Sequence, residues 1–100
     1  MELTGKQRRA LRALAHHLKP VVLVGSAGLS QAVIDKIEVE LDNHELIKVR
    51  VHQDAPLGTK EAGEDIAERI PNTHAVQKIG RMLVLYRARK KEPGIVLPKG

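Results

Sequence analysis

Three stretches of the chain repeat apolar residues at intervals of three and four positions, which is the spacing of a helix that buries one face. The predicted helices cover residues 5–18, 31–43 and 59–70. Thr4 and Ser30 stand just before the first two, where a hydroxyl caps a helix N-terminus, and Pro20 would end the first. In that first helix, the apolar face is expected to consist of Ala10, Leu11, Leu14 and Leu18.

Two stretches between these helices have the patterns of strands. Residues 21–24 are continuously apolar, as expected for a strand that is buried on both faces. Residues 46–52 alternate instead, so that their apolar members point to one side and the polar members Lys48, Arg50 and His52 point to the other. The second strand is therefore expected to have one covered and one open face.

The end of the chain predicts a hairpin. Residues 74–79 and 82–89 read as strands, and Gly80-Arg81 between them suits a two-residue turn with glycine first. The order of elements is then α-β-α-β-α-β-β. Strands separated by helices, with a closing hairpin, predict a compact layered α/β domain with a mixed four-stranded sheet.

The length and composition fit one small domain. The chain has 100 residues, 42% of them hydrophobic, and no cysteine. We expect a single domain over residues 1–91 and a tail over residues 92–100, which hold two prolines and two glycines. No apolar run is long enough for a transmembrane helix, and the first residues lack the apolar stretch of a secretory signal. With no disulfide to form, these features favour a cytoplasmic protein.

Charge is distributed unevenly along the sequence. The formal net charge is +5 and the pI is near 9.8. Residues 1–25 hold five basic side chains against one acid (+4), and residues 71–91 hold six against none (+6). Residues 30–46 hold one against five (−4), and residues 58–70 hold two against four (−2). The fold is therefore expected to have an acidic side and a basic side, and a basic side is typical of proteins that bind polyanions.

Aromatic residues are almost absent, since Tyr86 is the only one. Domains that read single-stranded nucleic acids by stacking bases on Phe, Tyr or Trp need a platform of such side chains. A contact with nucleic acid would therefore be made mainly to phosphate and sugar.

A tight turn bracketed by Gly25 and Gly28 joins the first predicted strand to the second helix. The first N–H groups of a helix have no intrahelical partner and lie at the positive end of its dipole, so they attract anions. Neither glycine has a Cβ, which would let a phosphodiester approach the main chain. The small residues Ser26 and Ala27 keep that approach open, and the Ser26 hydroxyl can donate a hydrogen bond. Taken alone, however, such a turn is more often structural than functional.

Basic side chains complete the candidate site. They are Lys6, Arg8, Arg9, Arg12 and Lys19 in and after the first helix, and Lys48 and Arg50 on the second strand. Each set alone is compatible with an ordinary solvated surface. Their combination with the glycine turn, in a basic protein without an aromatic platform, favours RNA phosphate as the ligand.

Several sequence blocks carry a resemblance to a known family. They are Leu3 to Arg9 (LTGKQRR), Leu18-Lys19-Pro20, Gly25 to Leu29 (GSAGL), His44 to Val49 (HELIKV), and Gly80 followed by Leu83 to Arg87 (LVLYR). In this order, over about residues 2–90, the chain resembles the CRM domain (chloroplast RNA splicing and ribosome maturation) in its stand-alone bacterial YhbY-type form.

The resemblance implies a fold similar to the C-terminal domain of translation initiation factor three. It also implies a KH-like Gly-x-x-Gly RNA-binding loop at Gly25, Ser26, Ala27 and Gly28, and association with the precursor of the large ribosomal subunit through its RNA. Family members commonly have Lys or Arg at the second loop position, where this chain has Ser26. We therefore expect the loop to contribute less here and the arginines of the first helix, Arg8, Arg9 and Arg12, to contribute more.

The sequence offers little for catalysis or metal binding. It has neither a Walker A lysine nor a Gly-x-Gly-x-x-Gly fingerprint, and Ser26 and Ser30 lie outside a Gly-x-Ser-x-Gly elbow. His16 and His17 are adjacent, so on a helix they point about 100° apart and make a poor ligand pair. We therefore expect a protein that is not an enzyme and holds neither a cofactor nor a metal ion.

Two other kinds of function remain open. The acidic helices at 31–43 and 59–70 could dock a basic ribosomal protein, which is compatible with RNA binding. Membrane association through the first helix is the weaker alternative, because that helix has no Trp or Phe anchors. We expect a monomer with RNA as its partner, ribosomal proteins as further candidate partners, and no membrane contact.

Overall fold

The computed structural model describes residues 2–90 and 93–99, so the domain boundary predicted between residues 91 and 92 lies outside the described residues. Within these residues, three helices and four strands follow one another in the predicted order. They are α1 (Gly5–Ala15), β1 (Pro20–Val24), α2 (Gln31–His44), β2 (Leu46–Val51), α3 (Thr59–Arg69), β3 (His74–Ile79) and β4 (Met82–Tyr86). The predicted α-β-α-β-α-β-β order is confirmed.

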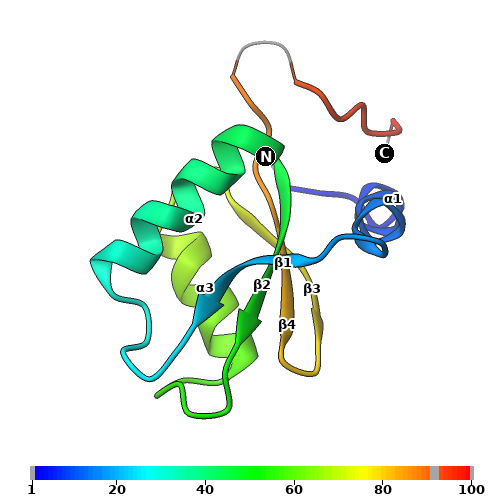
Figure 1. The fold of residues 1–100 in the computed structure, drawn as a ribbon. Coiled ribbons are helices and arrows are strands. Elements are labelled where there is room, and N and C mark those ends of the chain that lie inside the picture. Colours follow the sequence, from blue (N-terminus) through cyan, green and yellow to red (C-terminus); the bar gives the residue numbers. More distant parts are fainter. Residues whose placement is uncertain (1, 91–92, 100) are drawn as a thin grey trace.

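The four strands form one mixed sheet in the order β1-β2-β4-β3. β1 and β2 are parallel, whereas β4 is antiparallel to both of its neighbours, β2 and β3. This arrangement brings the β1–α2 turn, the β2–α3 loop and the β3–β4 hairpin to the same end of the strands, at the bottom of Figure 1.

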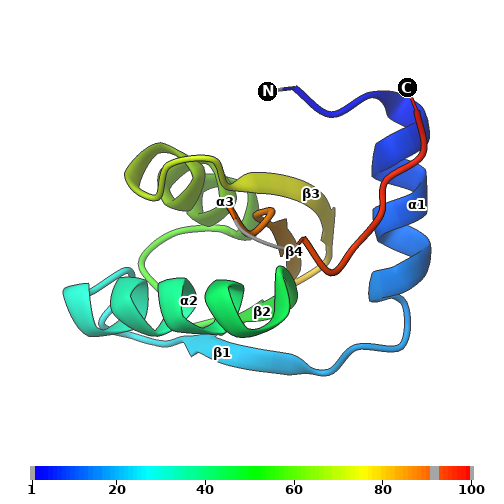
Figure 2. The ribbon, with the colours of Figure 1, turned by 90° about the horizontal axis from the view of Figure 1, so that it is seen from above.

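The helices cover the two faces of the sheet unequally. Figure 2 shows α2 and α3 on one side and α1 on the other. The core under α2 and α3 is the larger one and includes Ile37, Ile66 and Leu85, each with 0% of its surface exposed. The core under α1 is built around Leu11 and Tyr86. Because α1 is a single short helix, part of the sheet beside it stays open.

α1 begins where the sequence predicts and ends three residues earlier. The Thr4 hydroxyl accepts the Gln7 N–H at 3.1 Å, and the Gln7 side chain accepts the Thr4 N–H at 3.0 Å, which together make a capping box. The predicted end at Leu18 is wrong, since the helix stops at Ala15. Pro20 disfavours a helical conformation for the residue before it, and the chain uses residues 16–19 to turn into β1.

The predicted apolar face of α1 is only partly correct. Leu11 and Ala15 are buried against the sheet, but Leu14 and Leu18 keep 52% and 37% of their surface exposed. The early end of the helix takes Leu18 out of the helical phase. Leu14 and Leu18 instead border a mainly apolar hollow of ≈ 480 Å³ beside β1 and the end of α2.

β1 is not buried on both faces as its apolar run predicted. Val22 and Val24 lie in the core under α2, whereas Leu23 on the other face is 54% exposed. The reason is its position, because β1 is an outer strand and α1 packs against β2, β3 and β4.

β4 ends at Tyr86 rather than at Arg89, because the next residues turn toward the end of α2. The Arg87 guanidinium contacts Asp42 at 2.6 Å and donates to the Glu38 carbonyl at 3.3 Å. Arg89 donates in the same way to the carbonyl of Asn43 at 2.9 Å. These two cations therefore lie with the acidic helix.

The last described segment, residues 93–99, packs on the α1 side of the sheet. The buried carboxylate of Glu45 accepts N–H groups from Arg89 at 3.0 Å, Gly94 at 2.5 Å and Ile95 at 3.1 Å. Ile95 and Leu97 pack against the core under α1. Three backbone donors on one carboxylate thus fix the C-terminal segment against the domain.

Within residues 2–90 and 93–99, none of the helices is long and apolar enough to cross a membrane.

Candidate nucleic-acid interface

The glycine turn lies between β1 and α2 and is held by contacts on both sides. The Gly28 N–H donates to the Gly25 carbonyl at 2.9 Å, which closes the turn. Arg69, which is also paired with Asp65, donates to the Leu29 carbonyl at 2.9 Å and ties α3 to the turn. The turn is therefore a fixed element with Ser26 and Ala27 exposed at its tip.

The two glycines of the turn have different environments, which corrects the expectation that both admit a phosphodiester. Gly28 is buried with φ +67°, and a Cβ on it would lie 2.9 Å from Cγ of Pro56. Glycine is required there for the backbone conformation and for packing against the next loop. A Cβ on Gly25 would meet nothing within 4 Å. Only Gly25 therefore leaves room for a close approach from outside.

The first N–H groups of α2, behind the turn, are partly satisfied by the N-cap residue of the helix. The Ser30 hydroxyl accepts the Val33 N–H at 3.3 Å, as predicted for the N-cap. The amides of Gln31 and Ala32 precede the first intrahelical bond, which the Ile34 N–H makes to the Ser30 carbonyl at 3.0 Å. Anion binding at this turn would thus use the tip and the first helical amides.

The structure separates the basic helix from the glycine turn. α1 lies at the end of the sheet where β1 begins, and the turn lies where β1 ends (Figure 1). A five-residue strand spans about 16 Å. The expected arginines do not flank the turn directly, and the two parts of the predicted site are joined by the open face of the sheet.

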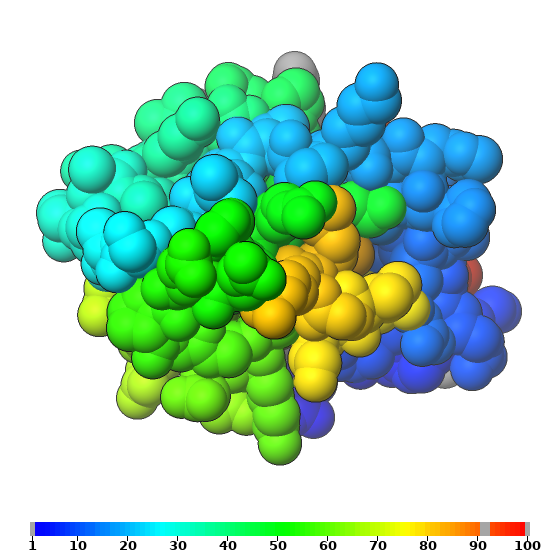
Figure 3. Space-filling view, turned by 60° about the horizontal axis from the view of Figure 1, so that its bottom comes forward, coloured from blue at the N-terminus to red at the C-terminus, as the bar shows by residue number. Residues whose placement is uncertain are grey.

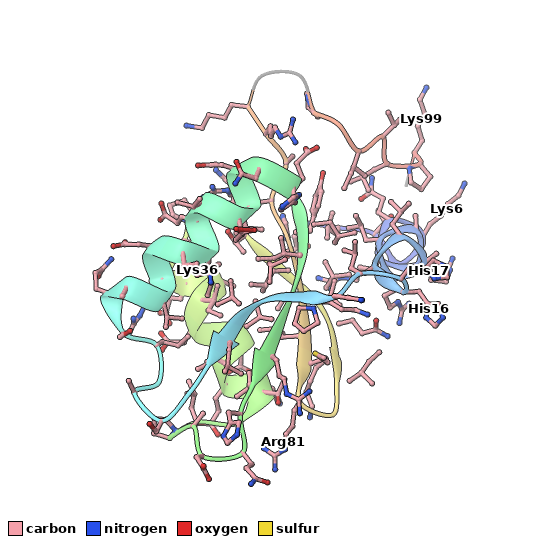
Figure 4. The ribbon with its side chains drawn as sticks, viewed as in Figure 1. Lys6, His16, His17, Lys36, Arg81 and Lys99 are labelled. Atoms are coloured by element: carbon pink, nitrogen blue, oxygen red, sulfur yellow. The ribbon has the colours of Figure 1, made fainter. Side chains whose placement is uncertain are left out.

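The basic residues in and after α1 differ in how far their side chains are exposed to solvent. Lys6, Arg9 and Arg12 are exposed, and Figure 4 shows Lys6 pointing away from the domain. Arg8 is half-buried and donates to the Ala75 carbonyl at 3.2 Å, so it links α1 to β3. Lys19, in the link after α1, is exposed. Arg12 is the member of this set that borders the open part of the sheet.

Lys48 and Arg50 lie on the open face of β2, as their alternation predicts. Lys48 is half-buried and its Nζ donates to the His16 carbonyl at 3.4 Å, in a groove that Arg12 also lines. Arg50 is exposed beside Leu23 of β1, with Met82 of β4 on its other side. These two side chains connect the α1 end of the face with the turn end.

Two further cations were missed by the sequence reasoning. Lys36 is the one lysine of the acidic helix α2, yet it lines a hollow along β1 together with Arg50. Arg81 is exposed at the hairpin, and its carbonyl accepts the Val51 N–H at 2.8 Å, which places it next to the end of β2. In the sequence Lys36 stands among the acids of the second helix and Arg81 belongs to the hairpin turn, so neither was expected beside β1 or β2.

The helices on the two sides of the sheet differ in their content of acidic residues. α1 carries four cations and no acid between Gly5 and Ala15, whereas eight acids lie on α2 and α3. Acidic residues do not line either groove of the open face in the described part of the chain. Figure 3 looks onto the bottom of the molecule, where the turn (cyan), the β2–α3 loop (green), the hairpin (yellow to orange) and α1 (dark blue) follow one another from left to right.

One histidine on the α1 side has a shifted pKa. His74 is half-buried with its ring stacked on that of Tyr86, the centroids 6.3 Å apart. Burial lowers the pKa of His74 from its ordinary value of 6.5, and the nearby Arg8 guanidinium lowers it further. The neutral imidazole is therefore favoured beside the cations of α1.

The histidines and carboxylates of the described residues lie apart from one another in groups of fewer than three. His16 and His17 lie edge to face with centroids 5.0 Å apart (Figure 4). Among residues 2–90 and 93–99, three His, Asp or Glu side chains nowhere form a group that could hold a metal ion.

The fold and this arrangement agree with the result of a family comparison. The model of the CRS1 / YhbY (CRM) domain matches residues 3–87. The chain therefore belongs to the CRM domain family, as the resemblance of its sequence blocks indicated.

Two bacterial relatives match over almost their whole length. An RNA-binding protein of Haemophilus influenzae is 44% identical, with 97% of this chain and 96% of the relative covered. YqeI of Bacillus subtilis, named a probable RNA-binding protein, is 41% identical over 96% of this chain and 99% of its own. Among solved structures, the solution structure of SAV1595 from Staphylococcus aureus, described as a candidate RNA-binding protein, has a TM-score of 0.81 and 42% identity. It covers 97% of this chain and 100% of that one.

Proposed function

We propose that this protein binds RNA by its phosphate backbone, along the surface formed by the glycine turn, the open face of β1 and β2, and α1. The observation that carries the proposal is the separation of charge, with cations on this surface and acids on α2 and α3. The names of the relatives support RNA as the polyanion. Cations on one side attract the backbone, and acids on the other side orient it.

The binding surface has two ends that a single RNA strand would connect. At one end the tip of the turn offers amides and the Ser26 hydroxyl, and Arg81 lies next to the end of β2. Lys36 and Arg50 line the hollow along Pro20 to Leu23 of β1. At the other end lie Arg12 and Lys48. The gap of about 16 Å along β1 is long enough for several successive phosphates, since a nucleic-acid strand advances about 3.4 Å per nucleotide when helical.

A platform of Phe, Tyr or Trp side chains has no part in this mode of binding. Tyr86 is the only aromatic residue and is 2% exposed in the core under α1. Affinity would therefore depend chiefly on released counterions and would fall steeply as salt is added.

The decisive experiment removes charge from the proposed surface and, in a matched variant, from elsewhere. Lys48→Gln with Arg50→Gln should weaken binding to a short RNA hairpin about 20-fold at about 0.1 M salt and lower the salt slope by about 1.4. Lys60→Gln with Lys90→Gln removes the same net charge at exposed positions away from both grooves. This control should change the affinity by less than about threefold and leave the slope nearly unaltered. Equal losses in the two variants would mean that the surface is not the binding site.

The glycine turn is tested by adding the charge that family members commonly carry. Ser26→Lys should raise RNA affinity about fivefold at about 0.1 M salt, with a salt slope steeper by about 0.7, because one more phosphate would be neutralised. Ser26 is exposed, so the fold should tolerate lysine. An unchanged slope would show that RNA does not reach the turn.

We further propose that the RNA is that of the large ribosomal subunit precursor and that the protein acts in the cytoplasm during assembly of this subunit. Sedimentation of a cell extract should place the protein with particles that precede the mature large subunit, and RNase treatment should release it. Association that survives RNase would instead favour a basic ribosomal protein docked on the acidic helices α2 and α3. A protein found only at the top of the gradient would contradict both.

A further inference from the structure

A groove between the second half of α1 and the open face of the sheet is lined by neutral and apolar side chains as well as basic ones. Binding of phosphate alone would not require the neutral and apolar groups. Its volume is ≈ 280 Å³, and it is lined by Arg12, Ala13 and Ala15 of α1, His16 just after α1, Lys48 of β2, and Gln77 and Ile79 of β3. Drug-sized ligands occupy pockets of about 300–1,000 Å³, so this one suits a smaller planar group. It holds a neutral amide and the apolar side chains of Ala13, Ala15 and Ile79 beside the nitrogen-bearing side chains of Arg12, His16 and Lys48.

An irregularity in β3 gives the groove its amide. The pairing of β3 with β4 shifts register between Ala75 and Gln77, so that Val76 is the extra residue of a β-bulge. Val76 is buried under α1, and Gln77 pairs with Val84, which belongs to the same core. Val76 and Gln77 therefore both face the α1 side of the sheet, whereas regular alternation would point one of them to the opposite face. Bulges are common where a strand aims a side chain at a ligand.

We propose that this groove holds one unstacked adenine of the bound RNA and that Gln77 reads its edge. The proposal rests on the RNA binding argued above and adds a preference for one base to a surface otherwise specific only for phosphate. It assigns to Gln77 a role that no charged residue of the surface can fill.

The chemistry of the lining favours a base over a second phosphate. A phosphate only accepts hydrogen bonds, whereas the Gln77 amide offers both a donor and an acceptor. Gln pairs in this bidentate way with N6 and N7 of adenine. The planar guanidinium of Arg12 and the ring of His16 can cover the faces of a base that has left its stack, and Ile79 adds an apolar contact.

Lys48 connects the groove to the phosphate path. Its ammonium donates to the His16 carbonyl at 3.4 Å in an exposed contact, and Lys48 lines the groove. It is therefore in position to neutralise the phosphate of the nucleotide whose base enters. Base and backbone of one nucleotide would thus be bound by adjacent side chains.

The test compares single-stranded oligoadenylate, oligocytidylate and oligouridylate of equal length. The natural protein should bind oligoadenylate most tightly. Gln77→Met keeps the length of the side chain and removes the amide, and it should weaken oligoadenylate binding about tenfold or more. Its affinity for oligouridylate and its salt slope should stay unchanged, because no phosphate contact is lost. Ala13→Leu, on an exposed position of α1 that also lines the groove, should abolish the preference by filling the space.

Asn43→Leu is the matched control, since it removes an exposed amide from α2 on the acidic side. It should leave all three affinities unchanged. Salt-dependent binding of all three oligonucleotides with equal affinity would overturn the adenine site while leaving the proposed phosphate binding in place. Absence of salt-dependent binding to any of them would overturn both.

Discussion

The two faces of the sheet differ in how completely they are covered. Under α2 and α3, thirteen buried residues of the described part of the chain form one continuous core, and the outer surfaces of these helices are acidic. Under α1 the buried cluster has seven members, and Lys48, Arg50 and Leu23 beside it remain accessible to differing degrees. The closed face provides most of the apolar burial that stabilises the domain, so the other face can leave strands uncovered for binding.

The largest expected effect comes from the closed face. Ile37 of α2 is fully buried in the core between this helix and the sheet, and Ile37→Ala should lower the free energy of unfolding by about 2–5 kcal/mol. Leu23→Ala on the open face should change it by less than about 0.5 kcal/mol. Urea denaturation measures both, and comparable losses would contradict the division between the faces.

Glu45 tests how the α1 side is held together. Glu45→Gln should cost about 2–3 kcal/mol, because one carboxylate oxygen that accepts backbone N–H groups is replaced by a donor. Carboxypeptidase should also remove the last residues faster in this variant. Glu40→Gln breaks only a surface contact with His44 at 3.5 Å and should cost less than about 1 kcal/mol. If the two variants are equally stable, the C-terminal segment does not depend on Glu45.

The two glycines of the turn should differ in the same way, because Gly28 is packed against Pro56 and Gly25 faces open space. Gly28→Ala should cost about 1–3 kcal/mol, because its φ is +67° and its Cβ would approach Pro56. Gly25→Ala should cost less than about 0.5 kcal/mol. Thermal unfolding of the two variants separates these outcomes, and a stable Gly28→Ala protein would show that the turn can rearrange.

The smallest effect is a pH dependence on the α1 side. Since burial lowers the pKa of His74 below 6.5, the unfolded chain binds this proton more readily than the folded one. The free energy of unfolding should therefore decrease as the pH falls below about 6.5, and the decrease should level off once the folded protein is also protonated. The difference between the urea titrations of the natural protein and of His74→Gln isolates this contribution. Parallel pH profiles would mean that His74 does not contribute.

Local signals in the sequence predicted the elements well. The caps at Thr4 and Ser30, the alternation of β2 and the glycine-first hairpin each depend on residues close together in the chain. For the same reason, Lys48 and Arg50 could be assigned to the face opposite the core.

Features that depend on strand order could not be read from the sequence. The apolar run of β1 is the same whether the strand is central or outer, so the exposure of Leu23 was not predictable. The positive φ of Gly28 is a local property, but its packing against Pro56 joins two loops. In the same way, the separation of α1 from the turn, and the position of Arg81 beside β2, follow only from the order β1-β2-β4-β3.

The position of β1 at the rim of the sheet also bears on self-association. An outer strand leaves main-chain groups that can template the addition of another chain. Here the strand is only five residues long, begins with Pro20 and shifts register between Pro20 and Val22. Lys36 and Arg50 stand along it, and like charges would repel the equivalent strand of a second copy. The cations proposed to attract RNA thus also discourage edge-to-edge growth between molecules of the protein itself.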